Sequence, residues 1–312
     1  MRANSGPVWV ALGIVYVVWG STYLGIKVAV ETLPPLFAAG TRFLAAGTIL
    51  VLVLAWFGRS LRVSRRELLS SAFVGLLLLT LGVGVVHVAE TRIDSSVAAM
   101  IAGTVPLQVI LLRTVNRERV TRALRVGTAV GLIGLALVVL PGIGSGSTAL
   151  GLLVMVAASI SWSVGSFVSP RLALPRDPFV ASALEMLFGG LFLTLAALAI
   201  GEGGDLGADS FALRSLAAWA YLVVVGSLVG FSAYAWLLRA APISLVVTHQ
   251  YVNPLVAIAL GMLLLGERPS PLALVGATLV VGAVYAAVRS ESPAKRPEPL
   301  RAPGKTPADQ PA

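Results

Sequence analysis

Long apolar stretches, separated by short polar or charged joints, run through almost the whole chain. A bilayer core about 30 Å thick needs about 20 mostly apolar residues in a helix, because no water is present there to satisfy free backbone groups. The pattern predicts ten such helices, over 8–30, 35–57, 67–89, 95–115, 123–140, 150–170, 178–200, 214–238, 243–265 and 271–289. We therefore expect an all-α integral membrane protein whose first stretch is retained as a helix.

Composition and charge narrow the class of protein. Of 312 residues, 57% are hydrophobic and 12% are charged, with a mean hydropathy of +0.91, whereas soluble domains carry about 25% charged residues. The net charge is +9, but Lys and Arg form short clusters between apolar runs instead of one basic face, so no nucleic-acid partner is expected. The chain has no cysteine, which excludes disulfides and thiolate metal sites.

The basic residues are distributed very unevenly between the two sides of the predicted membrane domain. With the N-terminus inside, three of them fall outside, namely Arg92, Arg214 and Arg268. The inside then holds Arg2, Arg59, Arg62, Arg65, Arg66, Arg113, Arg117, Arg119, Arg122, Arg125, Arg171, Arg176, Arg239, Arg289, Lys295, Arg296, Arg301 and Lys305. This asymmetry predicts cytoplasmic N- and C-termini in a plasma membrane of the bacterial inner-membrane type. Residues 290–312 are basic and proline-rich, and are expected to form a disordered cytoplasmic tail.

Matching residues recur at nearly constant offsets in the two halves of the chain. The pairs separated by 143 positions are Trp19 and Trp162, Pro35 and Pro178, and Arg42 and Glu185; Pro106 and Pro254 are separated by 148. The order predicts a duplicated unit, with one five-helix repeat at 1–145 and another at 146–289. Because five is odd, the second repeat enters the membrane the other way round, which is an inverted-topology arrangement typical of secondary transporters.

Several short phrases together resemble a known family. They are Trp19-Gly20-Ser21-Thr22-Tyr23 with Lys27, Pro34-Pro35, Arg42-Phe43, Thr104-Val105-Pro106, and Asn253-Pro254 followed by Leu265-Gly266-Glu267-Arg268. Over residues 8–289 the chain resembles the EamA family of the drug/metabolite transporter (DMT) superfamily. It departs from the pattern at Pro170, near the place where the first half has Lys27, and at Glu118, which lacks a preceding Leu-Gly. The resemblance implies a ten-helix exporter of amino acids, related metabolites or amphipathic compounds.

Ionisable residues at membrane depth are candidates for coupling or gating. The preferred interpretation of Lys27 and Arg42 is snorkelling to the outer interface, and the alternative is a role in a gate. Glu185 lies about 10 Å into its helix, which suits a buried partner or a water-filled lumen and supports the hypothesis that it takes part in proton coupling. His87 and His249 are either packing residues or groups that titrate near neutral pH.

Polar residues beside a proline point to the substrate pathway. Pro106 and Pro254 remove backbone donors in the fourth and ninth helices, which a membrane tolerates where the helix lines a cavity. The tryptophans at mid-helix stack on a substrate or fill the core, and small polar residues complete the lining. The predicted pathway residues are Trp19, Tyr23, Thr104, Gln108, Trp162, Ser163, Ser166, Tyr234, His249, Gln250, Tyr251 and Asn253.

A secondary transporter is the function that these patterns favour, with a small-molecule substrate and the lipid bilayer as partners. Import of another small solute is the closer alternative to export. An intramembrane enzyme is the more distant one, because the sequence has neither a nucleophile with a positioned base nor a His-Glu-x-x-His motif. No cofactor or metal is expected, and the lack of a Walker motif excludes ATP as the direct energy source. Gly127-x-x-x-Gly131 and Gly226-x-x-x-Gly230 indicate close helix packing, with a homodimer as the alternative.

Overall fold

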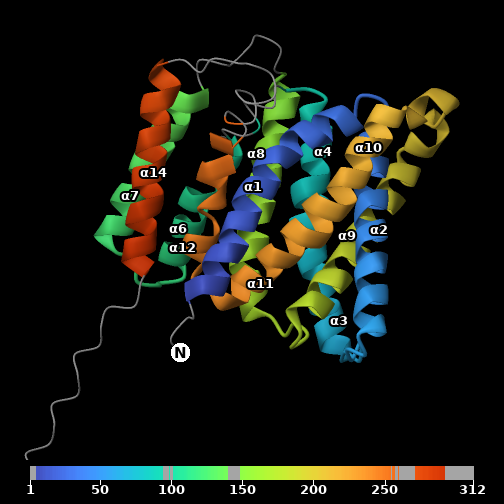
Figure 1. Cartoon of the computed structure of the whole chain (residues 1–312), viewed down its shortest axis with the longest axis horizontal. Coiled ribbons are helices and arrows are strands. Elements are labelled where there is room, and N and C mark those ends of the chain that lie inside the picture. Colours follow the sequence, from blue (N-terminus) through green and yellow to red (C-terminus); the bar gives the residue numbers. More distant parts are fainter. Residues whose placement is uncertain are drawn as a thin grey trace, which may run out of the picture.

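The computed structural model describes residues 5–93, 98, 101–139, 148–253, 255–256, 259 and 271–291, and these form a bundle of steeply aligned helices (Figure 1). Within the described ranges, six continuous helical runs are long and apolar enough to cross a membrane: Gly6–Ala29, Pro35–Trp56, Arg65–Glu90, Ala149–Arg171, Pro178–Ala199 and Leu213–Ala240. Shorter apolar helices add Val105–Val115 and Leu274–Ala283. The all-helical membrane architecture expected from the sequence is therefore confirmed.

The helices follow the predicted segments closely. Their bounds are α1 Ser5–Ala29, α2 Pro35–Trp56, α3 Arg65–Gly75, η1 Leu76–Gly84, α4 Val85–Glu90, α6 Val105–Val115, α7 Arg122–Val139, α8 Ala149–Val168, η3 Ser169–Arg171, α9 Pro178–Ala199, η4 Glu202–Asp205, η5 Ala208–Phe211, α10 Leu213–Tyr221, η6 Leu222–Phe231, α11 Ser232–Ala240, α12 Ile243–Val246 and α14 Pro271–Glu291. The fourth and ninth predicted helices are described only in part. Pro254, Leu265-Gly266-Glu267-Arg268 and the tail beyond Glu291 lie outside the described residues.

Local sequence signals fix where several helices begin. Ser64 and Glu67 form a reciprocal capping box at the start of α3, which satisfies two backbone donors that the first turn leaves free. Asp177 Oδ1 accepts a hydrogen bond of 2.9 Å from Phe179 N ahead of α9. Pro35 opens α2 in the same way that a proline opens α9, because its fixed φ and missing donor cost nothing at the first helical position.

Two antiparallel helix pairs are packed especially closely. In the pair α2 and α9, a Cβ added at Gly40 would lie 2.8 Å from the backbone nitrogen of Thr194. In the pair α7 and α14, a Cβ on Gly127 or Gly131 would come within 3.0 Å or less of the methyl group of Ala286 or Ala283. The first Gly-x-x-x-Gly motif therefore serves packing within the chain, and the homodimer alternative stays a prediction.

The third and eighth predicted helices each contain a π-helical segment, which the hydropathy pattern does not predict. These segments are η1, between α3 and α4, and η6, between α10 and α11. Each shifts hydrogen bonding from i+4 to i+5, so the carbonyl groups at its ends become available to side chains. Such irregular backbone is tolerated at membrane depth where it faces protein or a cavity.

The outer surface of the bundle is apolar, as a lipid-facing surface must be. Large side chains such as Trp56, Leu52 and Leu153 are more than half exposed. The start of α1 and the end of α14 lie at the same end of the bundle, at the bottom of Figure 1. We call this the terminal end, and we call the opposite one the far end.

Candidate functional site

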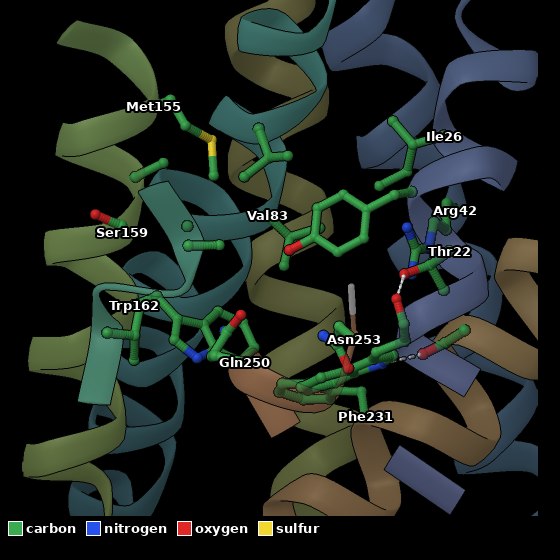
Figure 2. Close-up of a pocket in the computed structure, with 18 of the residues that line it drawn as sticks. Thr22, Ile26, Arg42, Val83, Met155, Ser159, Trp162, Phe231, Gln250 and Asn253 are labelled. Atoms are coloured by element: carbon green, nitrogen blue, oxygen red, sulfur yellow. Dashed lines mark hydrogen bonds between the residues drawn. The ribbon is translucent and has the colours of Figure 1, made fainter. Parts of the chain in front are cut away.

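A cavity of about 80 Å³ lies between the middle of the bundle and its far end. Side chains from α1, α2, α4, α6, α8 and both π-helical segments form its walls, together with Ala102, Gln250 and Asn253 (Figure 2). The residues that line it are Trp19, Thr22, Tyr23, Ile26, Arg42, Phe43, Gly82, Val83, Val86, Ala102, Val105, Met155, Ala158, Ser159, Trp162, Gly226, Phe231, Gln250 and Asn253. Both halves of the chain contribute, and most of the lining is apolar.

Four aromatic rings close the cavity toward the terminal end, and we call them the aromatic floor. Trp19 meets Trp162 edge to face at 5.4 Å and His249 at 5.0 Å between ring centroids. Tyr234 lies 4.9 Å from Trp19 and 5.1 Å from Trp162. Since both tryptophans also line the cavity, they fill the core and present ring surface to its interior at the same time.

Glycines in the two π-helical segments leave space for the two tryptophans. Trp19 Nε1 donates a 3.1 Å hydrogen bond to the carbonyl oxygen of Gly226 in η6. A Cβ on Gly230 would lie 2.6 Å from Trp19 Nε1, and one on Gly82 would lie 3.2 Å from Trp162 Cε3. The second Gly-x-x-x-Gly motif thus allows Trp19 to pack closely against η6, and Gly82 allows Trp162 to pack closely against η1. This motif, too, takes part in packing within the chain.

A compact polar network joins the fourth and sixth predicted helices beside the cavity. Gln108 Nε2 donates to Thr104 Oγ1 at 2.9 Å and to Ser159 Oγ at 3.0 Å. Its Oε1 accepts from Ser163 Oγ at 2.7 Å. The structure therefore brings together three residues predicted from the sequence, while Ser159 was missed. Ser159 and Ser163 are four apart and share a helix face, which is the signal that would have found it.

Arg42 contradicts the snorkelling interpretation. It is only 3% exposed and lines the cavity. Its Nε donates a 2.8 Å hydrogen bond to Ser227 Oγ, its guanidinium lies 4.9 Å from the ring centroid of Phe43, and its buried Nη1 has no hydrogen-bond partner among the described residues. The physical reason is packing: α2 lies against η6, where Gly226 leaves room for the guanidinium. The alternative interpretation, a role in a gate or site, remains a prediction.

Gln250 and Asn253 provide unsatisfied acceptors on another wall. Both line the cavity, and the buried side-chain oxygens Oε1 of Gln250 and Oδ1 of Asn253 lack partners in the described part of the chain. Buried polar atoms are normally hydrogen-bonded, so unsatisfied ones beside a cavity mark places where a ligand or water can bind. The cavity thus offers a cation on one wall and acceptors on another.

Other predicted pathway residues lie next to the cavity without lining it. Tyr234 and His249 belong to the aromatic floor, and the Tyr234 hydroxyl is 2.6 Å from Ser166 Oγ. Tyr251 points away from the cavity, toward α7, where a Cβ on Gly131 would lie 3.1 Å from its ring. Tyr251 therefore does not line this cavity, and its place in the substrate pathway stays a prediction.

The predicted coupling residues come from four different helices, α1, α2, α4 and α9. Glu185 is buried and does not line the cavity, and no ion pair joins it to Arg42 among the described residues. His87 is fully buried with Nδ1 2.8 Å from the carbonyl oxygen of Val83, which fits a packing role. Lys27 is exposed, and its Nζ donates to the carbonyl oxygen of Glu90 at 3.2 Å.

Glu90 is the residue that sequence reasoning missed most clearly. It is fully buried, and neither carboxyl oxygen has a hydrogen-bond partner among the described residues. The predicted third helix stopped at residue 89, so Glu90 was assigned to a joint, whereas α4 includes it. The signal was weak because a single carboxylate next to a predicted boundary is usually solvated.

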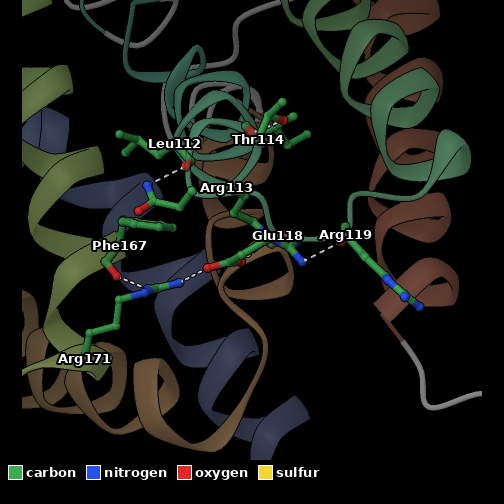
Figure 3. Close-up of polar contacts among 10 residues, drawn as sticks. Leu112, Arg113, Thr114, Glu118, Arg119, Phe167 and Arg171 are labelled. Atoms are coloured by element: carbon green, nitrogen blue, oxygen red, sulfur yellow. Dashed lines mark hydrogen bonds and ion pairs between the residues drawn. The ribbon is translucent and has the colours of Figure 1, made fainter.

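A cluster of polar contacts, which we call the polar clamp, lies at the terminal end of the bundle (Figure 3). It consists of Arg113, Glu118, Arg171 and Ser244. Glu118 accepts a 3.1 Å hydrogen bond from Arg113 Nε and pairs with Arg171, which also donates to the carbonyl oxygen of Phe167. Arg113 in turn donates to Ser244 of α12. The clamp links the ends of three predicted helices: the fourth, the sixth and the ninth.

No group of three or more His, Cys, Asp or Glu side chains that could hold a metal ion occurs in the described ranges.

Comparison with known proteins gives consistent matches. The sequence model of the EamA-like transporter family matches residues 6–140 and again 149–289. The chain is 38% identical over 282 residues to the inner membrane transporter YedA of Escherichia coli strain K12, itself uncharacterised, covering 89% of each chain. It is 25% identical to the chloroplastic WAT1-related protein At3g02690 of Arabidopsis thaliana, covering 89% of this chain and 68% of that one. A solved crystal structure, 20% identical, superposes with a TM-score of 0.72 over 91% of this chain and 98% of the other, which shows a shared fold.

Proposed function

Because this chain belongs to the EamA-like transporter family, we propose that it is an exporter of small zwitterionic or amphipathic metabolites that works by alternating access. The observation that carries the proposal is the cavity, which is enclosed by both halves of the chain and ends at the aromatic floor. Secondary transporters bind their substrates at such a place, near the bilayer midplane where two repeats meet.

The proposal includes ten membrane helices arranged as two inverted repeats, at 1–145 and 146–289, followed by a cytoplasmic tail. Three observations support it. The second and seventh helices pack as the pair α2 and α9, and the fifth and tenth as α7 and α14. The π-helical segments begin at Leu76 and Leu222, 146 positions apart. The tryptophan of each half contacts the π-helical glycine of the other half.

In this proposal the terminal end is cytoplasmic, as the Lys and Arg distribution predicts. The described conformation then has its cavity on the outer side and its polar clamp on the inner side. Alternating access requires the clamp to open and the outer side to close, and a substrate can drive that change only by binding one conformation more tightly than the other.

The chemistry of the cavity favours cargo of low net charge. A single guanidinium, two amide side chains and a predominantly apolar wall suit a small molecule with one acidic group and an apolar body. A polyanion would require several buried cations, and only Arg42 lines the cavity in the described part of the chain. The same site suits import equally well, so the direction of net transport needs its own test.

The test is transport by purified protein in liposomes, screened with labelled amino acids and amphipathic cations, with and without a pH gradient. Trp162→Ala should reduce transport about tenfold or more, because it removes one wall of the cavity. Trp56→Ala is the matched control, since Trp56 is 89% exposed on the lipid-facing surface. Equal transport by both variants at equal membrane levels would place the site elsewhere. Net flux measured in vesicles of known orientation decides between export and import.

A further inference from the structure

Arg42 carries a buried positive charge that the described protein does not neutralise. Its side chain is 3% exposed, and no carboxylate among the described residues forms an ion pair with it. One nitrogen donates to the neutral hydroxyl of Ser227, and Nη1 has no partner. Burying a cation without an anion is costly, and a structural role would normally be fulfilled by pairing. The side chain lies on the wall of the cavity, beside Thr22 in Figure 2.

Resting on the proposed transport function, we propose that Arg42 is the carboxylate-binding residue of the cavity. The cargo is a small apolar molecule that carries one carboxylate and, at a separate position, an N–H donor group. Guanidinium is suited to this task because it presents two parallel donors to the two oxygens of a carboxylate. The N–H group of the cargo donates to the unsatisfied oxygens of Gln250 and Asn253.

The remaining walls suit an apolar body in the cargo. Ile26, Val86 and Met155 present apolar surface to the cavity, and Trp162 adds ring surface from the aromatic floor. The volume of about 80 Å³ is far below the 300–1,000 Å³ of sites for drug-sized ligands. A dianion such as a phosphate ester is disfavoured, because a single guanidinium would leave one of its charges uncompensated in a mostly apolar cavity.

The first experiment compares each of four apolar amino acids with its own amide, which lacks the carboxylate but keeps the amine and the side chain. Valine, leucine, methionine and phenylalanine and their amides are titrated into the purified protein in nanodiscs, with intrinsic tryptophan fluorescence as the readout. We expect at least one acid to bind about 10- to 100-fold more tightly than its amide, the effect of charge-assisted hydrogen bonds. In Arg42→Gln that preference should vanish. If no acid is preferred by the wild-type protein, the proposal is overturned.

The second experiment separates a binding role from a structural one. Arg42→Gln without ligand should melt at the wild-type temperature or above it, because it removes an unpaired buried charge. A structural arginine would instead lower the melting temperature. Arg214→Gln is the control, since Arg214 is exposed and forms an ion pair of 3.8 Å with the exposed Glu31. Wild-type liposomes that transport an amphipathic cation but show no Arg42-dependent preference for acids would support transport and refute the carboxylate site.

Discussion

The polar clamp should hold the terminal end of the bundle shut, and Glu118→Gln tests this directly. The substitution keeps the size and hydrogen-bonding capacity of the side chain but removes the charge that both arginines contact. Arg113 and Arg171 come from different predicted helices, so losing Glu118 loosens contacts that span the terminal end (Figure 3). Because the cavity lies toward the far end, this change should shift the protein toward a conformation open at the terminal end.

The size of the shift follows from the exposure of the two ion pairs. The side chain of Arg113 is 13% exposed and that of Glu118 is 32% exposed, so their bond contributes about 1 kcal/mol. Arg171 is 42% exposed, and solvent screening reduces its contribution to about 0.5 kcal/mol. The total of about 1–2 kcal/mol corresponds to a change of about 5- to 30-fold in the equilibrium between conformations.

Cysteine labelling measures that equilibrium. Because the sequence has no cysteine of its own, only the introduced thiol reacts with the reagent. Val247→Cys, a buried position near α12, should react about 5- to 30-fold faster in the Glu118→Gln background. Ala158→Cys, in the cavity, should react more slowly. Glu31→Gln is the matched control, because Glu31 forms an ion pair at the far end. Unchanged labelling of Val247→Cys in Glu118→Gln would mean that the clamp does not close the terminal end.

Three further outcomes are expected. A cysteine at Ser60 should be shielded from an impermeant reagent outside intact cells while one at Gly204 reacts, and labelling at Ser60 would reverse the proposed orientation. Gln108→Ala breaks three hydrogen bonds, so it should lower the free energy of unfolding by about 1–3 kcal/mol and also lower transport. Wild-type stability and wild-type transport in this variant would show that the network is dispensable. Glu185→Gln should abolish the dependence of efflux on a pH gradient but keep substrate exchange, and Glu90→Gln is measured in parallel. If Glu185→Gln keeps the gradient dependence and Glu90→Gln loses it, the coupling role belongs to Glu90.

The helices and the polar neighbours of the cavity were predictable because they depend on local composition. Apolar length alone locates a helix in lipid, since no other backbone arrangement satisfies its polar groups there. Polar residues in an apolar helix are costly unless they find partners inside the bundle. Gln108 and Ser163 illustrate this: the sequence placed both in the pathway, and the structure joins them by a hydrogen bond.

The position of Arg42 could not be predicted, because it depends on a distant part of the chain. Counted along its helix, the residue lies near enough to the outer interface for a long side chain to reach water. Whether it does so depends on which helix covers it. Gly226 in η6, more than 180 positions away, leaves the space that the guanidinium fills. Glu90 was missed for a different reason. A helix boundary misplaced by one residue is enough to assign a buried carboxylate to a solvated joint.

The two π-helical segments link the architecture to the site. Trp19 in the first half donates to a carbonyl oxygen of η6 in the second half, and Ser161 in the second half donates to the carbonyl oxygen of Leu77 in η1. Each half therefore satisfies backbone groups that the irregular helix of the other half leaves free. The shape of the cavity consequently depends on how the two halves are docked. A rocking motion that separated them would break both hydrogen bonds and move both tryptophans, so a conformational change and a change in substrate affinity would occur together.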